Sequence, residues 1–210
     1  MQLFSRRVQM VGAAPAEMIA YATDMRSYVT GKVGRDVALW ATTFGAPVGT
    51  MSYTVRVEGV ADLQATMSVL MGDEEYQAKI AKGAHMSGGP AVDSLMQPIY
   101  GELGATPPVG SMAAVTTAEI ANGAVTDAIA WGVDMAMHVE SVTGMTCLFL
   151  ASQYGPFGTV GWISGAADAA GVDAANAAIN ADDAYMGKLG AIGDLFREGS
   201  GHQALLTRIA

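Results

Sequence analysis

The sequence has a single cysteine, Cys147, among its 210 residues. One cysteine excludes an intrachain disulfide, and its position in a strand-like run indicates a buried thiol. Long hydrophobic runs are also missing: no stretch approaches about 18 uncharged apolar residues, so no transmembrane helix is expected. The first residues, MQLFSRRVQMVG, lack the apolar segment of a signal peptide, which makes the cytoplasm the expected location.

Positive charge is scarce, because 11 Lys and Arg stand against 20 Asp and Glu, a net charge of −9 at pH 7. Nucleic acid and anionic membrane surfaces both select basic patches, so neither is an expected partner. Metal and catalytic signatures are absent as well. The sequence has no H-x-x-x-H or C-x-x-C spacing, no phosphate-binding loop and no nucleophile motif, so we expect no metal site.

What the chain does contain is apolar residues, at 51% against 15% charged. It also contains a repeat. Three segments of the first half resemble segments of the second half. The segment at 40–50 (WATTFGAPVGT) is similar to that at 150–159 (LASQYGPFGT), the segment at 18–25 (MIAYATDM) to that at 128–135 (AIAWGVDM), and the segment at 73–80 (DEEYQAKI) to that at 182–189 (DDAYMGKL). The aligned segments share 15 identities in 60 positions (8 in 28 plus 7 in 32), where composition alone would give roughly a third of that. We interpret this as duplication of a whole supersecondary unit.

Each copy reads as strand, helix, hairpin, helical region and strand, the ferredoxin-like β-α-β-β-α-β order. The predicted strands are Leu3–Val11, Val37–Phe44, Thr50–Glu58 and Ser94–Tyr100, then Met112–Ile120, Met145–Tyr154, Thr159–Ser164 and Gln203–Ile209. The predicted helices start at Pro15, Val60 and Asp73 in the first copy and span Ala124–Val139, Ala169–Asn180 and Asp182–Phe196 in the second. Pro98 places the first closing strand at a sheet edge, and we expect the second there too.

The two copies define the predicted domains: a first module at 1–103, a Gly/Pro linker at 104–110 (GATPPVG) and a second module at 111–210. A four-stranded sheet with helices on one face leaves its other face bare. The second copy is the simplest cover, so the sequence predicts two sheets packed face to face as a barrel-like sandwich.

This order, the TFGAPVGT turn and the two DxxYxxK helices resemble NIPSNAP-like members of the dimeric α+β barrel superfamily, in tandem over essentially the whole chain. The helix motifs are Asp73, Tyr76 and Lys79, and Asp182, Tyr185 and Lys188. The resemblance implies an α+β fold, two ferredoxin-like modules in a pseudo-dimeric α+β barrel, and a cavity between sheet and helices. It implies no single reaction, because relatives include cofactor-free monooxygenases, haem-binding or haem-degrading enzymes, isomerases and proteins without known activity.

The candidate catalytic residue is His138, because an imidazole transfers protons near neutral pH; the alternative is a helix-surface histidine. Arg7 and Glu119 lie on the first strand of each copy and could bracket a polar ligand, or form a solvated strand face. The remaining candidate ligand contacts are the aromatic residues Trp40, Tyr53 and Trp162, which could equally be ordinary core.

Two functions compete on these observations. The first is a protein that binds a small apolar or aromatic molecule, with cofactor-independent oxidation or isomerisation as its reaction. The second is a non-catalytic interaction protein, a homo-oligomer assembled through apolar surface. The first function needs no cofactor, while a haem-binding variant would require a histidine facing the cavity.

Overall fold

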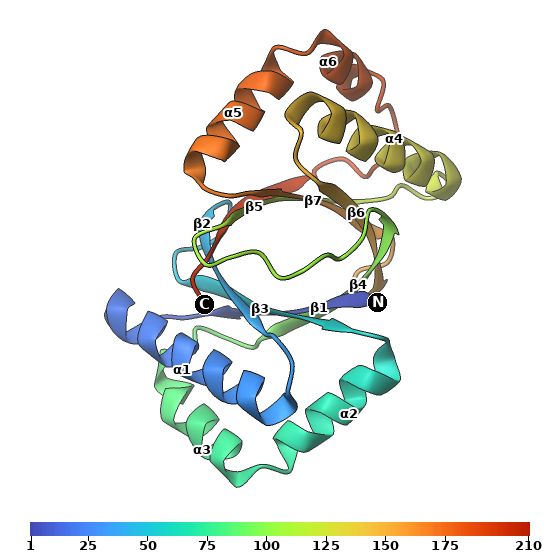
Figure 1. The fold of residues 1–210 in the computed structure, drawn as a ribbon. Helices are drawn as coiled ribbons and strands as arrows, with labels where there is room; N and C mark the ends of the chain where they lie inside the picture. The colour runs from blue at the N-terminus through green and yellow to red at the C-terminus, as the bar shows by residue number, and fades with distance from the viewer.

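The computed structural model describes residues 1–210, and its eight strands form one closed barrel (Figure 1). The first half contains β1 (Gln2–Gln9), α1 (Pro15–Val33), β2 (Ala38–Phe44), β3 (Thr50–Val57), α2 (Val60–Met71), α3 (Glu74–Gly83), a 3-10 turn η1 (Ala84–Met86) and β4 (Val92–Tyr100). The second half contains β5 (Met112–Glu119), α4 (Val125–Thr143), β6 (Cys147–Tyr154), β7 (Thr159–Ala166), α5 (Ala169–Asn180), α6 (Asp183–Gly190) and β8 (His202–Arg208). The α+β class and the barrel predicted from the sequence are therefore confirmed.

The strand order around the barrel is β1-β3-β2-β8-β5-β7-β6-β4, and neighbouring strands are antiparallel. The four strands of each half stand next to one another, and β2–β8 and β4–β6 ladders join the halves. The prediction that the closing strands are edges was wrong, because each is paired on both sides. Closure leaves no exposed backbone edge, and a register shift between Pro98 and Tyr100 accommodates the proline.

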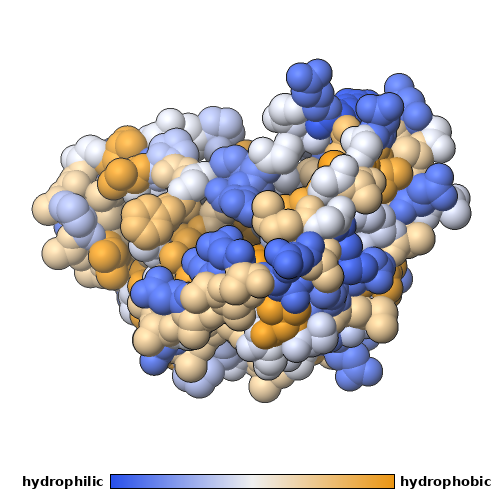
Figure 2. Space-filling model, turned by 90° about the horizontal axis from the view of Figure 1, so that it is seen from above, coloured by the Kyte–Doolittle hydropathy of each residue, from blue (hydrophilic) through white to orange (hydrophobic).

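Helices cover the outside of the barrel in two layers on opposite sides, α1–α3 against the first half and α4–α6 against the second (Figure 1). Figure 2 looks down on the molecule from above and shows hydrophobic and hydrophilic residues intermixed over this face. No helix combines the length and apolarity that a membrane crossing requires.

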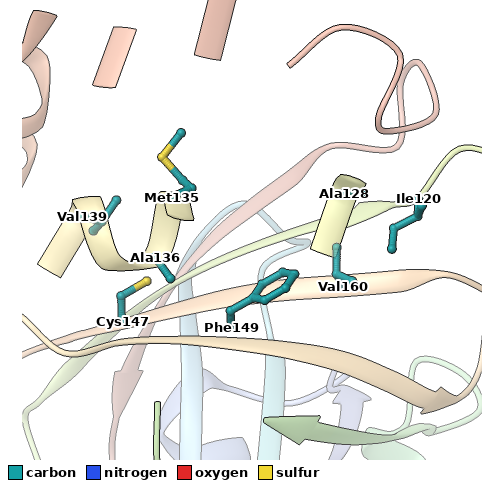
Figure 3. Close-up of a cluster of buried hydrophobic side chains, with 8 residues drawn as sticks. All are labelled: Ile120, Ala128, Met135, Ala136, Val139, Cys147, Phe149 and Val160. Carbon is teal, nitrogen blue, oxygen red and sulfur yellow. The ribbon is translucent and has the colours of Figure 1, made fainter. Parts of the chain in front are cut away.

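The largest buried cluster lies between the second-half sheet and α4 (Figure 3). Phe149 is fully buried, and Cys147, 1% exposed, is a free thiol as predicted. Gly132 of α4 allows the close packing: a Cβ at that position would stand 2.3 Å from a ring carbon of Phe149. Small residues on α4 therefore let the helix approach the sheet.

The helix termini follow the sequence closely, with one exception. Asp73 accepts hydrogen bonds from the main-chain amides of Glu75 and Tyr76, and Asp182 from that of Tyr185, as N-cap residues do. The prediction that the last helix reaches Phe196 was wrong, because α6 ends at Gly190. The following glycine-containing turn brings Phe196 back to bridge β5 at Ile120 and to pack on the second-half core.

The segment between the two halves runs across one opening of the barrel (Figure 1). Residues 102–109 border the barrel interior. Its end is held by the β8 backbone: the Gly110 amide donates to the Arg208 carbonyl at 2.9 Å, and the Arg208 amide donates to the Ser111 carbonyl at 2.8 Å. The predicted linker is thus a strap over one end of the barrel.

Candidate functional site

The barrel encloses a cavity of about 1130 Å³. Side chains on its wall are mostly small, among them Ser5, Ala38, Ser52, Ala113 and Ala204. Small inward-facing residues leave the centre of an eight-stranded barrel hollow, whereas bulky ones would fill it. A volume of this size is ample for a small organic molecule.

Opposite ends of the barrel cavity carry different charged groups. At the open end Arg7 is exposed and has no ion-pair partner, while Glu119 pairs with Arg197 at 3.0 Å. At the strapped end Arg56 donates through Nη1 to Thr106 Oγ1 of the strap at 2.5 Å. Arg7 and Glu119 therefore both border one cavity, and Glu119 is neutralised from outside it.

A second pocket, of about 280 Å³, lies between the first-half sheet and helices α1–α3. Of its 23 lining residues, 17 are hydrophobic. Four methionines contribute to the wall: Met10, Met25, Met67 and Met86. Flexible thioether side chains give an adaptable apolar surface, which suits a flat or irregular ligand.

Polar groups converge on this first-half pocket from sheet and helix. Tyr53 on β3, Tyr21 on α1 and Tyr76 on α3 line it together with Arg6. Tyr53 donates weakly to the Ala22 carbonyl at 3.4 Å, and Tyr21 donates to the Lys79 carbonyl at 3.0 Å.

Charge and burial set the protonation of these groups. Arg6 is held by a bidentate ion pair with Asp93 at 2.7 and 2.8 Å, which raises the pKa of Arg6. Burial raises the pKa of Tyr53 and Tyr21. Both phenols stay neutral at pH 7, so they can donate hydrogen bonds to a ligand and cannot act as bases.

The corresponding region of the second half is filled. Trp162 stacks on Phe149 with ring centroids 4.9 Å apart, and Trp131 meets Trp162 edge-on at 5.9 Å. Phe196 packs against both tryptophans, at 5.6 and 5.8 Å. Trp131 and Trp162 stand where the repeat places Tyr21 and Tyr53 in the first half (110 and 109 residues earlier). Larger aromatic side chains thus occupy the volume that the first half leaves open.

The structure distributes the sequence-predicted site residues over three places. Arg7, Trp40 and Glu119 border the barrel cavity, and Tyr53 borders the first-half pocket. Trp162 lies in the filled aromatic cluster of the second half. These five candidates and His138 do not form one site.

His138 lies on α4, away from both cavities. Its Nε2 is 2.8 Å from Oδ1 of Asp182, the residue that caps α6, and this contact lowers the pKa of Asp182. The contact ties α4 to α6 in the way that Tyr28 ties α1 to Asp73 in the first half, through bonds of 2.9 and 3.0 Å. A catalytic role for His138 stays a prediction, and its geometry is that of a helix-joining side chain.

Three residues of the cavities escaped the sequence analysis: Arg6, Arg56 and Tyr76. Strand alternation puts Arg6 on the opposite face from Arg7, which was a signal that the two arginines serve different cavities. Arg56 was visible on the polar face of its predicted strand, which also carries Ser52, Thr54 and Glu58. Tyr76 was recognised only as part of the repeated helix motif.

Haem would need a histidine that faces a cavity of suitable width. Of the three histidines, only His202 borders a cavity, at the exposed open end of the barrel. His85 lies on η1 with Nδ1 3.1 Å from the Lys82 carbonyl. The chain has no cluster of three or more metal-binding side chains. The histidines therefore fit a haem ligand poorly.

Comparisons with known proteins show which fold this is. No family model matches the chain, and no curated protein matches its sequence. Among solved structures, an anthrone oxidase-like protein superposes with a TM-score of 0.71 at 10% identity, over 100% of this chain and 91% of the other. A proposed monooxygenase from Fusobacterium nucleatum gives 0.67 at 10% identity, over 100% and 92%. A variant of chlorite dismutase from Candidatus Nitrospira defluvii gives 0.52 at 11% identity, over 98% and 91%.

At these identities the likeness shows the fold, which is that of the dimeric α+β barrel proteins. Membership in that superfamily, and among its NIPSNAP-like members, stays a prediction.

Proposed function

We propose that the protein binds a small, mainly aromatic molecule in the first-half pocket, between the sheet and helices α1–α3. The observation that carries this proposal is the difference between the halves. One half holds a pocket of about 280 Å³ edged by tyrosine hydroxyls, and the other fills the corresponding volume with tryptophan and phenylalanine. A void in one of two similarly built halves favours retention for a ligand over loose packing, since interiors are otherwise close-packed.

The comparison of halves rests on our proposal that they are duplicated modules, 1–103 and 111–210, joined by the strap at 104–110. Repeated contacts support it. Lys79 pairs with Asp24, and Lys188 pairs with Asp134, at equivalent positions of the repeat. Each half has the same strand order, β4-β1-β3-β2 and β8-β5-β7-β6.

The chemistry of the first-half pocket defines its ligand. Methionine and aliphatic side chains form the walls, and neutral phenols with the Arg6 guanidinium form the polar edge. Such a pocket recognises a flat apolar body that carries a hydrogen-bond acceptor, such as a ring carbonyl. No carboxylate, imidazole or thiol lines it, so the protein favours binding and hydrogen-bond donation over proton abstraction.

The proposed reaction is cofactor-independent oxidation of the bound aromatic molecule by dioxygen. Its support is the likeness to an anthrone oxidase-like protein and to proposed monooxygenases. With anthrone as the probe, the reaction is anthrone plus O₂ giving anthraquinone plus water. The ring CH₂ is oxidised to a carbonyl, and the second oxygen atom leaves as water.

The test compares anthrone binding, by calorimetry, in the native chain and in the double variant Tyr21→Trp/Tyr53→Trp, which imports the aromatic residues of the second half. We expect saturable binding to the native chain and its loss in the variant. The control is Ile163→Trp, which narrows the barrel cavity and should leave anthrone binding intact. Equal binding by the native chain and the double variant would exclude this pocket. Oxygen uptake and anthraquinone absorbance on the same samples test the reaction separately.

A second candidate function is assembly through the hairpin tips. The β2–β3 and β6–β7 turns lie at the same end of the barrel and expose Phe44, Val48, Tyr154 and Phe157, at 69, 94, 63 and 86%. Exposed aromatic and aliphatic side chains on two loops at one end of the barrel favour contact with another molecule, here a second copy of the chain. Light scattering of the native chain and of Val48→Ser/Phe157→Ser would test it: an oligomer that dissociates in the variant supports assembly, and a native monomer excludes it.

A further inference from the structure

The barrel interior has the features of a second binding site, separate from the first-half pocket. Its central wall is apolar, where Val115, Ile163 and Leu206 pack against the buried cluster of Ala38, Trp40 and Ala113. The Trp40 indole N–H donates to Thr54 Oγ1 at 3.0 Å. Because the only polar atom of the indole is already bonded to the wall, the ring offers an apolar surface to whatever occupies the cavity.

The strapped end of the same cavity holds a cation without a counter-ion. Arg56 points into the cavity from β3, and no carboxylate lies within 4.0 Å of its guanidinium. Its Nη1 reaches only the neutral hydroxyl of Thr106, and its Nε is buried with no hydrogen-bond partner. A buried, unpartnered donor on a charged side chain is rare, and it points to a partner that completes the site.

Asp36, whose charge acts on Arg56, cannot supply that partner. Asp36 is bound to Arg26 at 3.0 Å and lies 3.9 Å from Arg208, which is 8% exposed. A hydrogen bond from Thr106, with the nearby arginines, lowers the pKa of Asp36, so the carboxylate is already ionised and shared. Arg26, Arg56 and Arg208 thus share one aspartate, and Glu102 of the strap, which also lines the cavity, lies more than 4.0 Å from Arg56.

We propose that the barrel interior binds an amphiphile with a carboxylate group, which pairs with Arg56 beneath the strap while its apolar body lies against Trp40. The planar guanidinium can bind both carboxylate oxygens, through Nε and the neighbouring Nη. The strap closes this end, so the ligand enters with its head group first from the open end at the hairpin tips. Arg56 and Trp40 do not line the first-half pocket, although Thr54 and Val55 border both cavities, so the two proposals can be tested separately.

The probes are decanoate and decan-1-ol, which share a ten-carbon chain and differ in charge. Affinities are measured by calorimetry. We expect the native chain to bind decanoate at least tenfold more tightly than decan-1-ol. In Arg56→Gln this preference should vanish, while the affinity for decan-1-ol stays the same. The matched charge control is Lys82→Gln on the outer helix α3, which should keep the preference.

Other outcomes would overturn the inference. The native chain could bind decanoate no more tightly than decan-1-ol, or could bind neither probe. Alternatively, Arg7→Gln could lose the preference for decanoate while Arg56→Gln keeps it. If Arg56→Gln does not fold, Ile163→Trp provides the test from the opposite wall without changing charge: it narrows the cavity and should weaken binding of both probes. Unchanged decanoate binding in Ile163→Trp would place the ligand away from this part of the barrel wall and would overturn the inference. Tyr21→Trp/Tyr53→Trp should bind decanoate normally.

Discussion

Gly132 is the position where the packing of the second half can be tested most directly. We predict that Gly132→Ala destabilises the protein by about 2 kcal/mol, although alanine is the better helix former. A Cβ at this position would stand 2.3, 2.7 and 2.8 Å from three ring carbons of Phe149. Ordinary carbon contacts begin near 3.4 Å, so the ring or the helix would have to move by about 1 Å.

The magnitude follows from two opposing effects. Replacing glycine by alanine inside a helix stabilises by about 1 kcal/mol. Overpacking a core costs about 1–3 kcal/mol, and the upper end applies here because Phe149 is fully buried and stacked on Trp162. A cost of about 3 less a gain of about 1 leaves about 2 kcal/mol of destabilisation.

The assay is chemical denaturation of four chains: native, Gly132→Ala, Phe149→Leu and the double variant. The first half carries the alternative pair at the equivalent positions, Ala22 with Leu39. We therefore expect Gly132→Ala to be nearly neutral in the Phe149→Leu background, a coupling of about 2 kcal/mol. Gly31→Ala on α1, where nothing lies within 4 Å of the added Cβ, is the control and should stabilise by up to about 1 kcal/mol. The reasoning would be refuted if Gly132→Ala were as stable as the native chain. It would also be refuted if the effect of Gly132→Ala were the same in the native and Phe149→Leu backgrounds.

Two further predictions concern the helix caps. The ion pair with Lys32 and the hydrogen bond from Tyr28 lower the pKa of Asp73 to about 2, below the value near 4 expected for an unfolded chain. Its contribution is therefore full above about pH 4 and is lost as the pH falls toward about 2. Denaturation midpoints between pH 7 and pH 2 should show Asp73→Asn less stable at pH 7 and the gap closing in acid; a pH-independent gap would contradict this. His138→Ala removes the contact to Asp182 but leaves the Tyr185 amide bonded to that cap at 2.6 Å. We expect the unfolding midpoint to fall by about 2 °C, with anthrone binding and oxidation unchanged. Loss of turnover in a folded His138→Ala would restore this residue as the catalytic group.

Local pattern was sufficient for most of the fold. The helices and strands and their order could be predicted from three local signals. These are the alternation of residues in the strands, the proline at the start of one helix and the aspartates that cap two others. The closing strands were misplaced because edge or interior status depends on pairing between the halves, which no local pattern records. The end of α6 was misplaced because Leu195 and Phe196 continue an apolar spacing after the chain has turned at Gly190 and Gly193.

The sequence predicted the binding sites less well than the fold, because aromatic residues at equivalent positions of the repeat have opposite roles. Tyr53 borders an open pocket, whereas Trp162 fills the corresponding space in the second half. The difference depends on the size of the side chains around each of them. Period-two alternation could have separated Trp40 from Tyr53 by face. It could not reveal that the face carrying Trp40 encloses a cavity, since that depends on the small residues of seven other strands.

A single chain also permits what two identical subunits would not. In a symmetric dimer every substitution appears on both sides of the barrel, so a filled pocket would be filled twice and an inward-facing arginine would face its own copy. Here Arg7 and Arg56 border the barrel cavity from the first half, whereas the second half offers Thr117 and Glu119. The two joined halves can thus contribute different charges to the barrel cavity, and they can differ in the volume of the pocket between sheet and helices. That asymmetry gives the barrel interior two distinct ends, and an amphiphile can be bound in only one direction between unlike ends.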